Sequence, residues 1–326
     1  MTSIINLPEI KEIIRKNSAE ELIKIIEEGF VQYAQKKVIV PPVGYMRFDS
    51  PPGDLHIKYG YIKNDDYYVI KIASGFYDNP ALGLNSSNGM MLLFSQKTGE
   101  VKSILIDEGY LTDIRTAIAG AVAAKYLAPS KVSCIGIVGT GMQARLQLQY
   151  LETVTSCRDV IVWGRSKDKL ESFKKDASLK NFVIRITTDM TQLTSRCHLI
   201  VTTTPSKKPL IYVDDVLPGT HITAMGADAD GKQELDPRII AKADIVVADS
   251  IDQCVDHGDL GFAVREGLID LSKIIGLGDV IANKGLQRGN DEQITIADLT
   301  GVAIQDIQIT KYVYEASFAK RATEKS

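Results

Sequence analysis

Lys71 and Arg115 are basic residues in surroundings that do not suit a solvated charge. Lys71 lies within the apolar run 67–73, which predicts a largely buried strand. A lysine there needs an anionic partner or a lowered pKa, unless it lies at a strand edge where its amine reaches water. Arg115 follows Thr112, which we predict as a helix N-cap, and a cation in the first turn opposes the helix dipole. We expect Asp113 or a bound carboxylate or phosphate to compensate Arg115.

Asp228 follows the apolar run 220–225, which predicts a parallel strand. In doubly wound sheets, ligands bind at the carboxyl ends of the strands, so this carboxylate is a candidate for acid–base chemistry. Loop aspartates are also common turn formers, and Asp230 is equally eligible by position. The pattern alone therefore predicts a carboxylate at this edge without choosing between the two.

A glycine-rich turn follows the apolar run 132–138 and precedes a helical pattern. In this GxGxxA turn, Gly139 permits the tight bend and Gly141 lets the backbone approach a pyrophosphate, while Ala144 lets the helix pack on the strand. The N–H groups that begin the helix then face the anion. The turn therefore predicts a dinucleotide-binding site, and the expected cofactor contacts are Gly139, Thr140, Gly141, Met142 and Gln143.

The residues after the second predicted strand, 159–163, indicate which dinucleotide binds. NAD sites place an acid about 20 residues beyond the glycines, whereas this chain continues Gly164-Arg165-Ser166. Arg165 can pair with a 2′-phosphate and stack on the adenine; the alternative is a solvated arginine in a lysine-containing loop. Because the missing acid and the available arginine agree, NADP(H) is favoured over NAD(H), with Gly164, Arg165 and Ser166 at the cofactor.

Two kinds of pattern divide the chain. The first part combines an amphipathic helix at 18–36 with short runs separated by turn residues, which predict antiparallel hairpins. The middle alternates helices with apolar runs of the parallel-strand type, at 132–138, 159–163, 182–186, 198–204, 220–225 and 244–249. We predict an α/β protein with a Rossmann doubly wound domain at 119–303. Residues 1–118 and 304–326 should form an α+β substrate-binding and dimerisation domain.

Composition excludes several classes of protein. A net charge of −3 argues against nucleic-acid binding, and a 44% hydrophobic content is typical of a globular enzyme. The four cysteines lack the spacing of a disulfide framework or a zinc site, and the histidines lack metal-ligand spacing, so no metal is expected. We also expect no membrane segment and a cytoplasmic location. The apolar hairpin strands, including residues 90–94, have too little of their own domain to cover them, which predicts a homodimer joined through this part of the chain.

Several of these segments together resemble the ornithine cyclodeaminase/μ-crystallin family. The resemblance spans nearly the whole chain in the right order, and it rests on Lys71, 111–117, 139–144, 226–235 and 298–306. It implies an NAD(P)-dependent enzyme, dimers of a Rossmann and an α+β domain, and a small amino or imino acid as substrate. Carried over by position, Lys71 and Arg115 hold the substrate carboxylate, and Asp228 handles the substrate nitrogen. Further cofactor positions implied by the resemblance are Thr116, Thr203, Thr204, Thr300 and Gly301.

The chain departs from the family pattern near His56, where cyclodeaminases carry a glutamate. Strand alternation places His56 and Lys58 on one face, as candidate substrate contacts; a core or edge histidine is the alternative for His56. The glutamate's absence weakens the case for an ornithine site. We therefore favour a reductase of cyclic ketimines such as pyrroline- or piperideine-2-carboxylate. The alternatives are ornithine cyclodeaminase, then an open-chain amino-acid dehydrogenase, then a non-catalytic crystallin-like protein that binds nucleotide.

Overall fold

The computed structural model describes residues 2–76, 78–229 and 231–323. The chain forms two compact units, unit 1 (Met1–Arg115 with Val302–Ser326) and unit 2 (Thr116–Gly301). Their limits lie within three residues of the domain limits predicted from the sequence, at 115 against 118 and at 302 against 304. It is an α/β protein with a parallel Rossmann-like sheet in unit 2 and a mixed sheet in unit 1.

Unit 1 is built on a mixed sheet in the order β1-β7-β6-β5-β4-β2, with β3 paired to β4. The predicted hairpins are present, since β3 to β7 pair antiparallel, whereas β1 lies parallel to β7. The strands are β1 (Ser3–Asn6), β2 (Val38–Ile39), β3 (Gly44–Asp49), β4 (Pro52–Ile62), β5 (Tyr67–Phe76), β6 (Ser87–Ser95) and β7 (Val101–Ile106). The helices are α1 (Leu7–Lys16), α2 (Ala19–Ala34), the first part of α3 (Tyr110–Leu127) and α11 (Ala303–Thr323).

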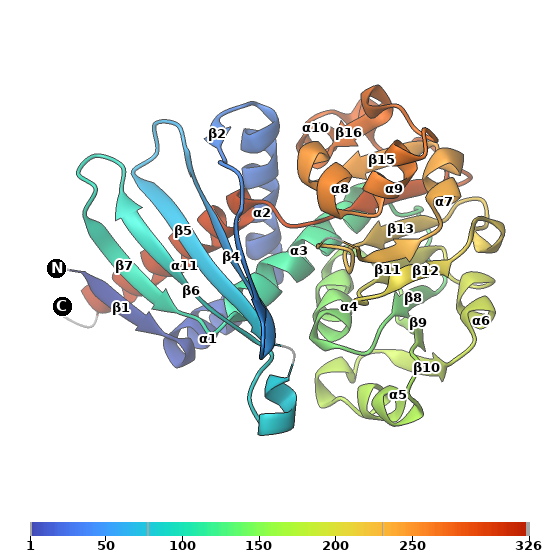
Figure 1. Ribbon diagram of the computed structural model, residues 1–326, viewed down its shortest axis with the longest axis horizontal. Helices are drawn as coiled ribbons and strands as arrows, with labels where there is room; N and C mark the ends of the chain where they lie inside the picture. The colour runs from blue at the N-terminus through green and yellow to red at the C-terminus, as the bar shows by residue number, and fades with distance from the viewer. Residues whose placement is uncertain (1, 77, 230, 324–326) are drawn as a thin grey trace. The chain divides into compact units, whose positions relative to one another are not determined.

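The two faces of this sheet differ. Strand register places Leu105, Met91 and Lys71 in one row on the same face, and all three are buried. α11 packs on β4, β5 and β6 and contacts this face through the Thr310 hydroxyl, which donates to Met91 Sδ at 2.8 Å. Figure 1 shows α11, in red, running along the sheet. The opposite face carries exposed apolar side chains, among them Ile4, Tyr59, Met90 and Ile106.

Unit 2 is an eight-stranded sheet in the order β10-β9-β8-β11-β13-β17-β15-β16, and every adjacent pair is parallel. Its strands are β8 (Ile135–Val138), β9 (Asp159–Trp163), β10 (Val183–Thr187), β11 (Leu199–Thr202), β13 (His221–Ala224), β15 (Ile245–Ala248), β16 (Ile274–Gly276) and β17 (Thr295–Asp298). A separate short pair joins β12 (Lys207–Ile211) to β14 (Gln233–Leu235). The strand order reverses between β8 and β11, the point where doubly wound sheets bind ligands.

Helices connect these parallel strands, as crossover connections require. The helices between the strands are α4 (Met142–Val154), α5 (Lys167–Lys174), α6 (Met190–Thr194), α7 (Pro237–Lys242), α8 (Ile251–His257), α9 (Leu260–Arg265) and α10 (Leu277–Ala282), and the rest of α3 precedes β8. Strands β8, β11, β13, β15 and β17 are buried along their whole length. This explains their continuous apolar sequences, because helices cover both faces of such a sheet.

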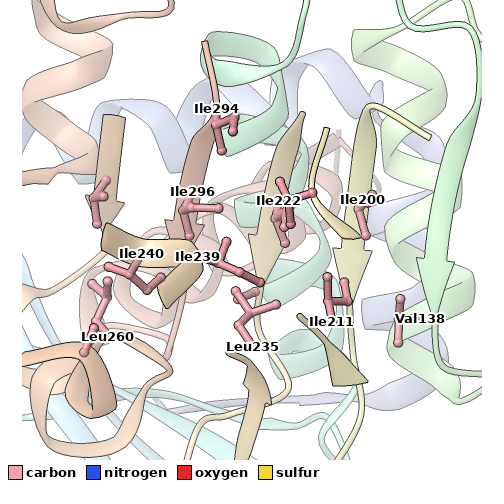
Figure 2. Close-up of a cluster of buried hydrophobic side chains, with 14 of the residues drawn as sticks. Val138, Ile200, Ile211, Ile222, Leu235, Ile239, Ile240, Leu260, Ile294 and Ile296 are labelled. Atoms are coloured by element: carbon pink, nitrogen blue, oxygen red, sulfur yellow. The ribbon is translucent and has the colours of Figure 1, made fainter. Parts of the chain in front are cut away.

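The core of unit 2 lies between these strands and the segment from β14 to α9. Figure 2 shows Ile200, Ile222 and Ile296, from three neighbouring strands, side by side with Leu235 and Ile239. Each of these side chains is at most 1% exposed. Burying one such side chain contributes about 1.5–3 kcal/mol to stability, so the packing fixes the strands whose carboxyl ends carry the candidate site.

The sequence patterns missed some elements. No element was predicted before residue 18, yet β1 and α1 lie there, and β16 and β17 were also missed. Cysteine spacing gave no sign that the Sγ atoms of Cys134 and Cys197 lie 3.3 Å apart as buried free thiols. Within the described part of the chain, no helix is long and apolar enough to cross a membrane, and no group of three His, Cys, Asp or Glu side chains is placed to hold a metal ion.

Candidate active site

Two basic side chains of unit 1 share one buried carboxylate oxygen. Lys71 Nζ lies 2.9 Å from Asp306 Oδ1, and Arg115 Nε lies 3.0 Å from the same atom. Arg115 Nη1 donates to Gln305 Oε1 at 2.8 Å. We call Lys71, Arg115, Gln305 and Asp306 the unit 1 cluster; each is at most 5% exposed. Strand β5 thus brings its lysine to the first turn of α11, where a carboxylate is also favoured by the helix dipole.

The electrostatics of this cluster suit anion binding and proton transfer. Burial and the neighbouring Arg115 lower the pKa of Lys71 to about 7, despite the opposing effect of Asp306. Burial alone would raise the pKa of Asp306, but Lys71 and Arg115 hold it below its ordinary value. Asp306 therefore stays ionised, and its Oδ1 atom pairs with both Lys71 and Arg115. A substrate carboxylate next to Lys71 and Arg115 would balance their charge.

The structure corrects our reading of the Arg115 segment. Thr112 is not the N-cap, because α3 begins at Tyr110 and the Asp107 carboxylate accepts the Leu111 amide at 2.9 Å. Arg115 is therefore the sixth residue of α3 and lies outside its first turn. Asp306, which we did not single out as a partner, compensates Arg115 across 191 residues of sequence.

Lys58 and His56 lie on the strand next to Lys71, as alternation predicted. Lys58 is the direct cross-strand neighbour of Lys71, and it contributes to lowering the pKa of Lys71. His56 Nε2 lies 3.6 Å from Asp54 Oδ1, and its ring lies 5.0 Å from that of Tyr45. Lys58 thus adds positive charge beside the unit 1 cluster, whereas these contacts of His56 run along its own hairpin.

The glycine turn of unit 2 has the geometry of a phosphate-binding loop. Gly139 has φ of 126°, and a Cβ there would lie 2.5 Å from Thr203 Oγ1. Gly141 is the N-cap of α4; no side chain caps the helix there, and a Cβ on Gly141 would meet no atom within 4 Å. The open approach to Gly141 and the uncapped start of a 13-residue helix fit a dinucleotide pyrophosphate.

Other residues hold this turn in place. Arg145 Nη1 donates to the carbonyl oxygens of Thr140 and Gly141 at 2.5 and 3.0 Å, and its Nε donates to Asp176 Oδ2. Sequence reasoning missed this role. Met142 is 61% exposed at the start of α4. Gln143, the other predicted contact in the turn, is the second residue of α4.

The residues predicted to choose the dinucleotide follow β9 directly. Gly164 is close-packed, since a Cβ there would lie 2.8 Å from Thr140 Cγ2. Ser166 is the N-cap of α5 and accepts the Lys169 amide at 3.4 Å. Arg165, between them, is exposed. The structure thus brings the end of β9 beside the glycine turn, and the preference for NADP(H) over NAD(H) stays a prediction.

Most of the remaining predicted cofactor positions follow strands of unit 2, whereas Thr116 is the seventh residue of α3. Thr203 follows β11, and its amide and hydroxyl donate to the Val138 carbonyl at 2.9 and 3.1 Å. The amides of Thr300 and Gly301 donate to the buried Asp249 carboxylate at 3.2 and 2.7 Å. The Thr116 carbonyl accepts from Gln147 Nε2 at 3.2 Å. These contacts anchor the segments at the sheet edge, and the cofactor roles of their residues stay predictions.

Asp228 lies in the loop after β13, where the sequence placed it. Its side chain is 52% exposed, and Lys232 Nζ lies 2.6 Å from its Oδ1. This ion pair was not predicted. Asp230, the equally eligible carboxylate, lies outside the described residues.

Sequence reasoning also missed three buried acids of unit 2. Glu234 accepts hydrogen bonds from the loops after β11 and β13, Asp259 accepts the Glu234 amide, and Asp298 accepts the Leu260 amide. Glu234 belongs to the segment 226–235 that carries the family resemblance, and Asp298 begins the segment 298–306. For Glu234 and Asp298, their position in these segments was the available signal, because the sequence around an acid in a short strand does not show whether its side chain is buried.

Comparison with known proteins shows the family to which the chain belongs. The sequence profile of the ornithine cyclodeaminase/mu-crystallin family matches residues 6–321. An uncharacterised cyclodeaminase of Sinorhizobium fredii is 42% identical over 311 residues, covering 94% of this chain and 92% of the relative. The chain belongs to this family. It is therefore an NAD(P)-dependent oxidoreductase of the family that includes amino-acid dehydrogenases and imino-acid reductases.

Two solved structures of family members match along nearly their whole length. An archaeal alanine dehydrogenase dimer with bound NAD is 35% identical, with a TM-score of 0.88, covering 98% of this chain and 97% of that one. The Δ1-pyrroline-2-carboxylate reductase of Thermococcus litoralis, in complex with NADH and L-proline, is 26% identical with a TM-score of 0.89, covering 98% of both chains. These matches confirm the predicted fold class and family.

Proposed function

We propose that this enzyme reduces the C=N bond of a small cyclic α-imino acid, such as Δ1-pyrroline-2-carboxylate or Δ1-piperideine-2-carboxylate, with NADPH as the favoured cofactor. The observation that carries the proposal is the unit 1 cluster, in which two buried cations share one carboxylate oxygen. Such a pair suits the carboxylate that every α-imino acid carries. The pyrroline-2-carboxylate reductase match supports the substrate class.

Each candidate residue has a separate task in this proposal. Arg115 and Lys71 bind the substrate carboxylate and orient the α-carbon. Asp228 stabilises the protonated imine through its negative charge. Lys71, whose pKa lies at about 7, is able to deliver a proton near neutral pH. The bound nicotinamide supplies the hydride that is added to the α-carbon.

The cofactor preference rests on the end of β9. No acid follows this strand to bind a ribose 2′-hydroxyl, and the exposed Arg165 lies next to the N-cap Ser166. A guanidinium there is suited to a 2′-phosphate. Gly139, Gly141 and the start of α4 would hold the pyrophosphate.

We also propose that the enzyme is a homodimer joined through the exposed apolar face of the unit 1 sheet. Ile4, Met90 and Ile106 on this face are 54%, 37% and 37% exposed. An apolar surface of several neighbouring strands is typical of a protein–protein contact. The dimeric state of the archaeal alanine dehydrogenase supports this arrangement.

An open-chain amino-acid dehydrogenase is the second candidate, because identity to the alanine dehydrogenase exceeds that to the pyrroline-2-carboxylate reductase. One substrate panel separates the two. The purified enzyme is incubated with NADPH and either Δ1-pyrroline-2-carboxylate or pyruvate plus ammonia. In a third reaction it is incubated with ornithine and catalytic NAD+, without NADPH. We expect the highest kcat/KM with the cyclic imine. A higher value with pyruvate plus ammonia would favour the second candidate, and rapid ornithine turnover without net change of cofactor would favour cyclodeamination.

A further inference from the structure

Glu234 is a fully buried carboxylate that connects two loops at the ligand-binding edge of unit 2. Its Oε1 accepts the amide and the hydroxyl of Thr204 at 2.6 and 2.7 Å. Its Oε2 accepts the Thr202 hydroxyl at 2.6 Å and the Gly226 amide at 2.8 Å. Thr202 ends β11 and Gly226 follows β13, which are adjacent strands of the sheet. One side chain thus fixes the chain beyond both strand ends.

The fit around Glu234 is tight. A Cβ on Gly226 would lie 2.2 Å from the Thr204 carbonyl oxygen and 2.5 Å from Glu234 Oε2. The loop after β13 therefore passes directly against the loop after β11, with the carboxylate joining the two. The loop after β11 carries Thr203 and Thr204, and the loop after β13 carries Asp228.

The backbone of Glu234 is held by a second buried carboxylate, that of Asp259. The amides of Glu234 and Leu235 donate to Asp259 Oδ1 at 2.8 and 2.9 Å. Asp259 precedes α9, and Asp298, at the end of β17, accepts the Leu260 amide at 2.9 Å. The backbone of Glu234 is therefore anchored to the sheet, so a change at its carboxylate moves the loops in front of it and leaves its own strand in place.

We propose that Glu234 is a positioning residue, whose carboxylate holds the cofactor-binding loop after β11 and the Asp228 loop in register. This role rests on the function proposed above, in which Thr203, Thr204 and Asp228 take part. Oε1 accepts the Thr204 amide and Oε2 accepts the Gly226 amide, so both side-chain oxygens must act as hydrogen-bond acceptors. A protonated Glu234 keeps its shape but loses the charge that strengthens all four hydrogen bonds.

The surroundings of Glu234 make its ionisation sensitive to pH. Burial, followed by the charge of Asp259, raises the pKa of Glu234 to about 7. Burial also raises the pKa of Asp259 to about 6 and that of Asp298 well above its ordinary value. The other charged groups of this edge are Asp249 after β15 and the Asp228–Lys232 pair in the loop. Acidification through neutral pH should therefore loosen both loops.

The test measures NADPH affinity and kcat between pH 6 and 8.5 for the wild type and for Glu234→Gln. In this variant, an NH2 group replaces one oxygen and faces a backbone N–H, so one loop contact is lost at every pH. We expect wild-type NADPH affinity to fall as the pH drops through about 7. In Glu234→Gln the affinity should be low and independent of pH, and kcat at pH 8 should be about 10- to 100-fold below the wild-type value. The pH profile of kcat also contains the titration of Lys71, whose pKa is about 7, so the pH-dependent comparison uses NADPH affinity. Asp236→Asn is the matched control, since this carboxylate caps α7 and should leave the pH profile unchanged.

Thr202→Val provides a second variant in case Glu234→Gln does not fold. It removes one hydrogen bond to the charged carboxylate, so the midpoint of the acid limb should move to higher pH. The proposal is wrong if Glu234→Gln keeps the wild-type pH dependence and NADPH affinity, or if Thr202→Val leaves the midpoint in place. NADPH binding needs no imine, so these outcomes stay separate from failure of the proposed function, which would appear as pH-dependent binding without imine reduction by the wild type.

Discussion

Replacement of Lys71 by methionine should abolish catalysis without destabilising the protein. In Lys71→Met the Asp306 carboxylate keeps Arg115 as its partner, 3.0 Å away, and an apolar side chain takes a buried position between Lys58 and Met91 on the sheet. Burial penalises the charged form of Lys71, and its removal leaves the buried Arg115–Asp306 pair complete, so no buried charge is left without a partner. We therefore expect an unchanged or higher free energy of unfolding at pH 7.

The same variant should change how stability depends on pH. The pKa of Lys71 is about 7 in the folded protein and 10.5 in the unfolded chain. Between these values the unfolded chain binds one more proton, so the wild-type free energy of unfolding rises with pH. The rise is at most about 1.4 kcal/mol per pH unit, or roughly 3 kcal/mol from pH 7 to 9. Lys71→Met lacks the titrating group and should lack this rise.

Urea denaturation at pH 7 and pH 9 measures both effects. Asp306→Asn is the control with the opposite sign, because it leaves Lys71 and Arg115 without their shared carboxylate. Losing one partner of a buried ion pair costs about 3–5 kcal/mol. The reasoning is refuted if Lys71→Met is as destabilised as Asp306→Asn, or if its stability follows the wild-type pH dependence.

Three further experiments test the remaining assignments. Arg165→Ala should erase most of a preference for NADPH over NADH, because the charge-assisted contact with the 2′-phosphate is worth about 1.5–3 kcal/mol. A wild type whose Kd is lower for NADH than for NADPH contradicts the assignment. Asp228→Asn should reduce kcat at least about 100-fold while NADPH binding survives, and a larger loss in Asp230→Asn would show that the other carboxylate acts. Ile106→Lys should convert the dimer to a monomer in sedimentation, whereas Val183→Lys, at an exposed position of the edge strand β10, should not. A monomeric wild type at micromolar concentration rules out the proposed interface.

A local mismatch in the sequence singled out Lys71, whereas the mismatch inferred for Arg115 was wrong, because Arg115 lies outside the first turn of α3. Lys71 stood out because a charge interrupts an apolar strand, and the glycine turn because an apolar strand precedes it and a helical pattern follows it. The parallel strands were predictable for a related reason, since burial on both faces leaves continuous apolar runs. These signals depend only on residues that are close in sequence, so they can be recognised without knowledge of the fold.

The buried acids Asp306 and Glu234 could not be assigned a role in the same way. Asp306 pairs with Lys71 across 235 residues of sequence, and an acid in the first turn of a helix is ordinary. Glu234 lies between a glutamine and a leucine in a three-residue strand, which shows neither its burial nor its contacts with two loops. The Thr112 N-cap was predicted wrongly because Asp107, which caps the first turn of α3, precedes the turn at Glu108 and Gly109. These roles depend on tertiary contacts.

Transfer of deuterium is the most direct test of the central claim, that this chain reduces an α-imino acid. Δ1-pyrroline-2-carboxylate is incubated with the enzyme and NADPH that carries deuterium at nicotinamide C4, on the face that is transferred, and the proline formed is analysed by mass spectrometry. We predict one deuterium atom at the α-carbon of each proline formed and one NADPH consumed. Unlabelled proline, or no proline while pyruvate and ammonia give labelled alanine, would contradict the account.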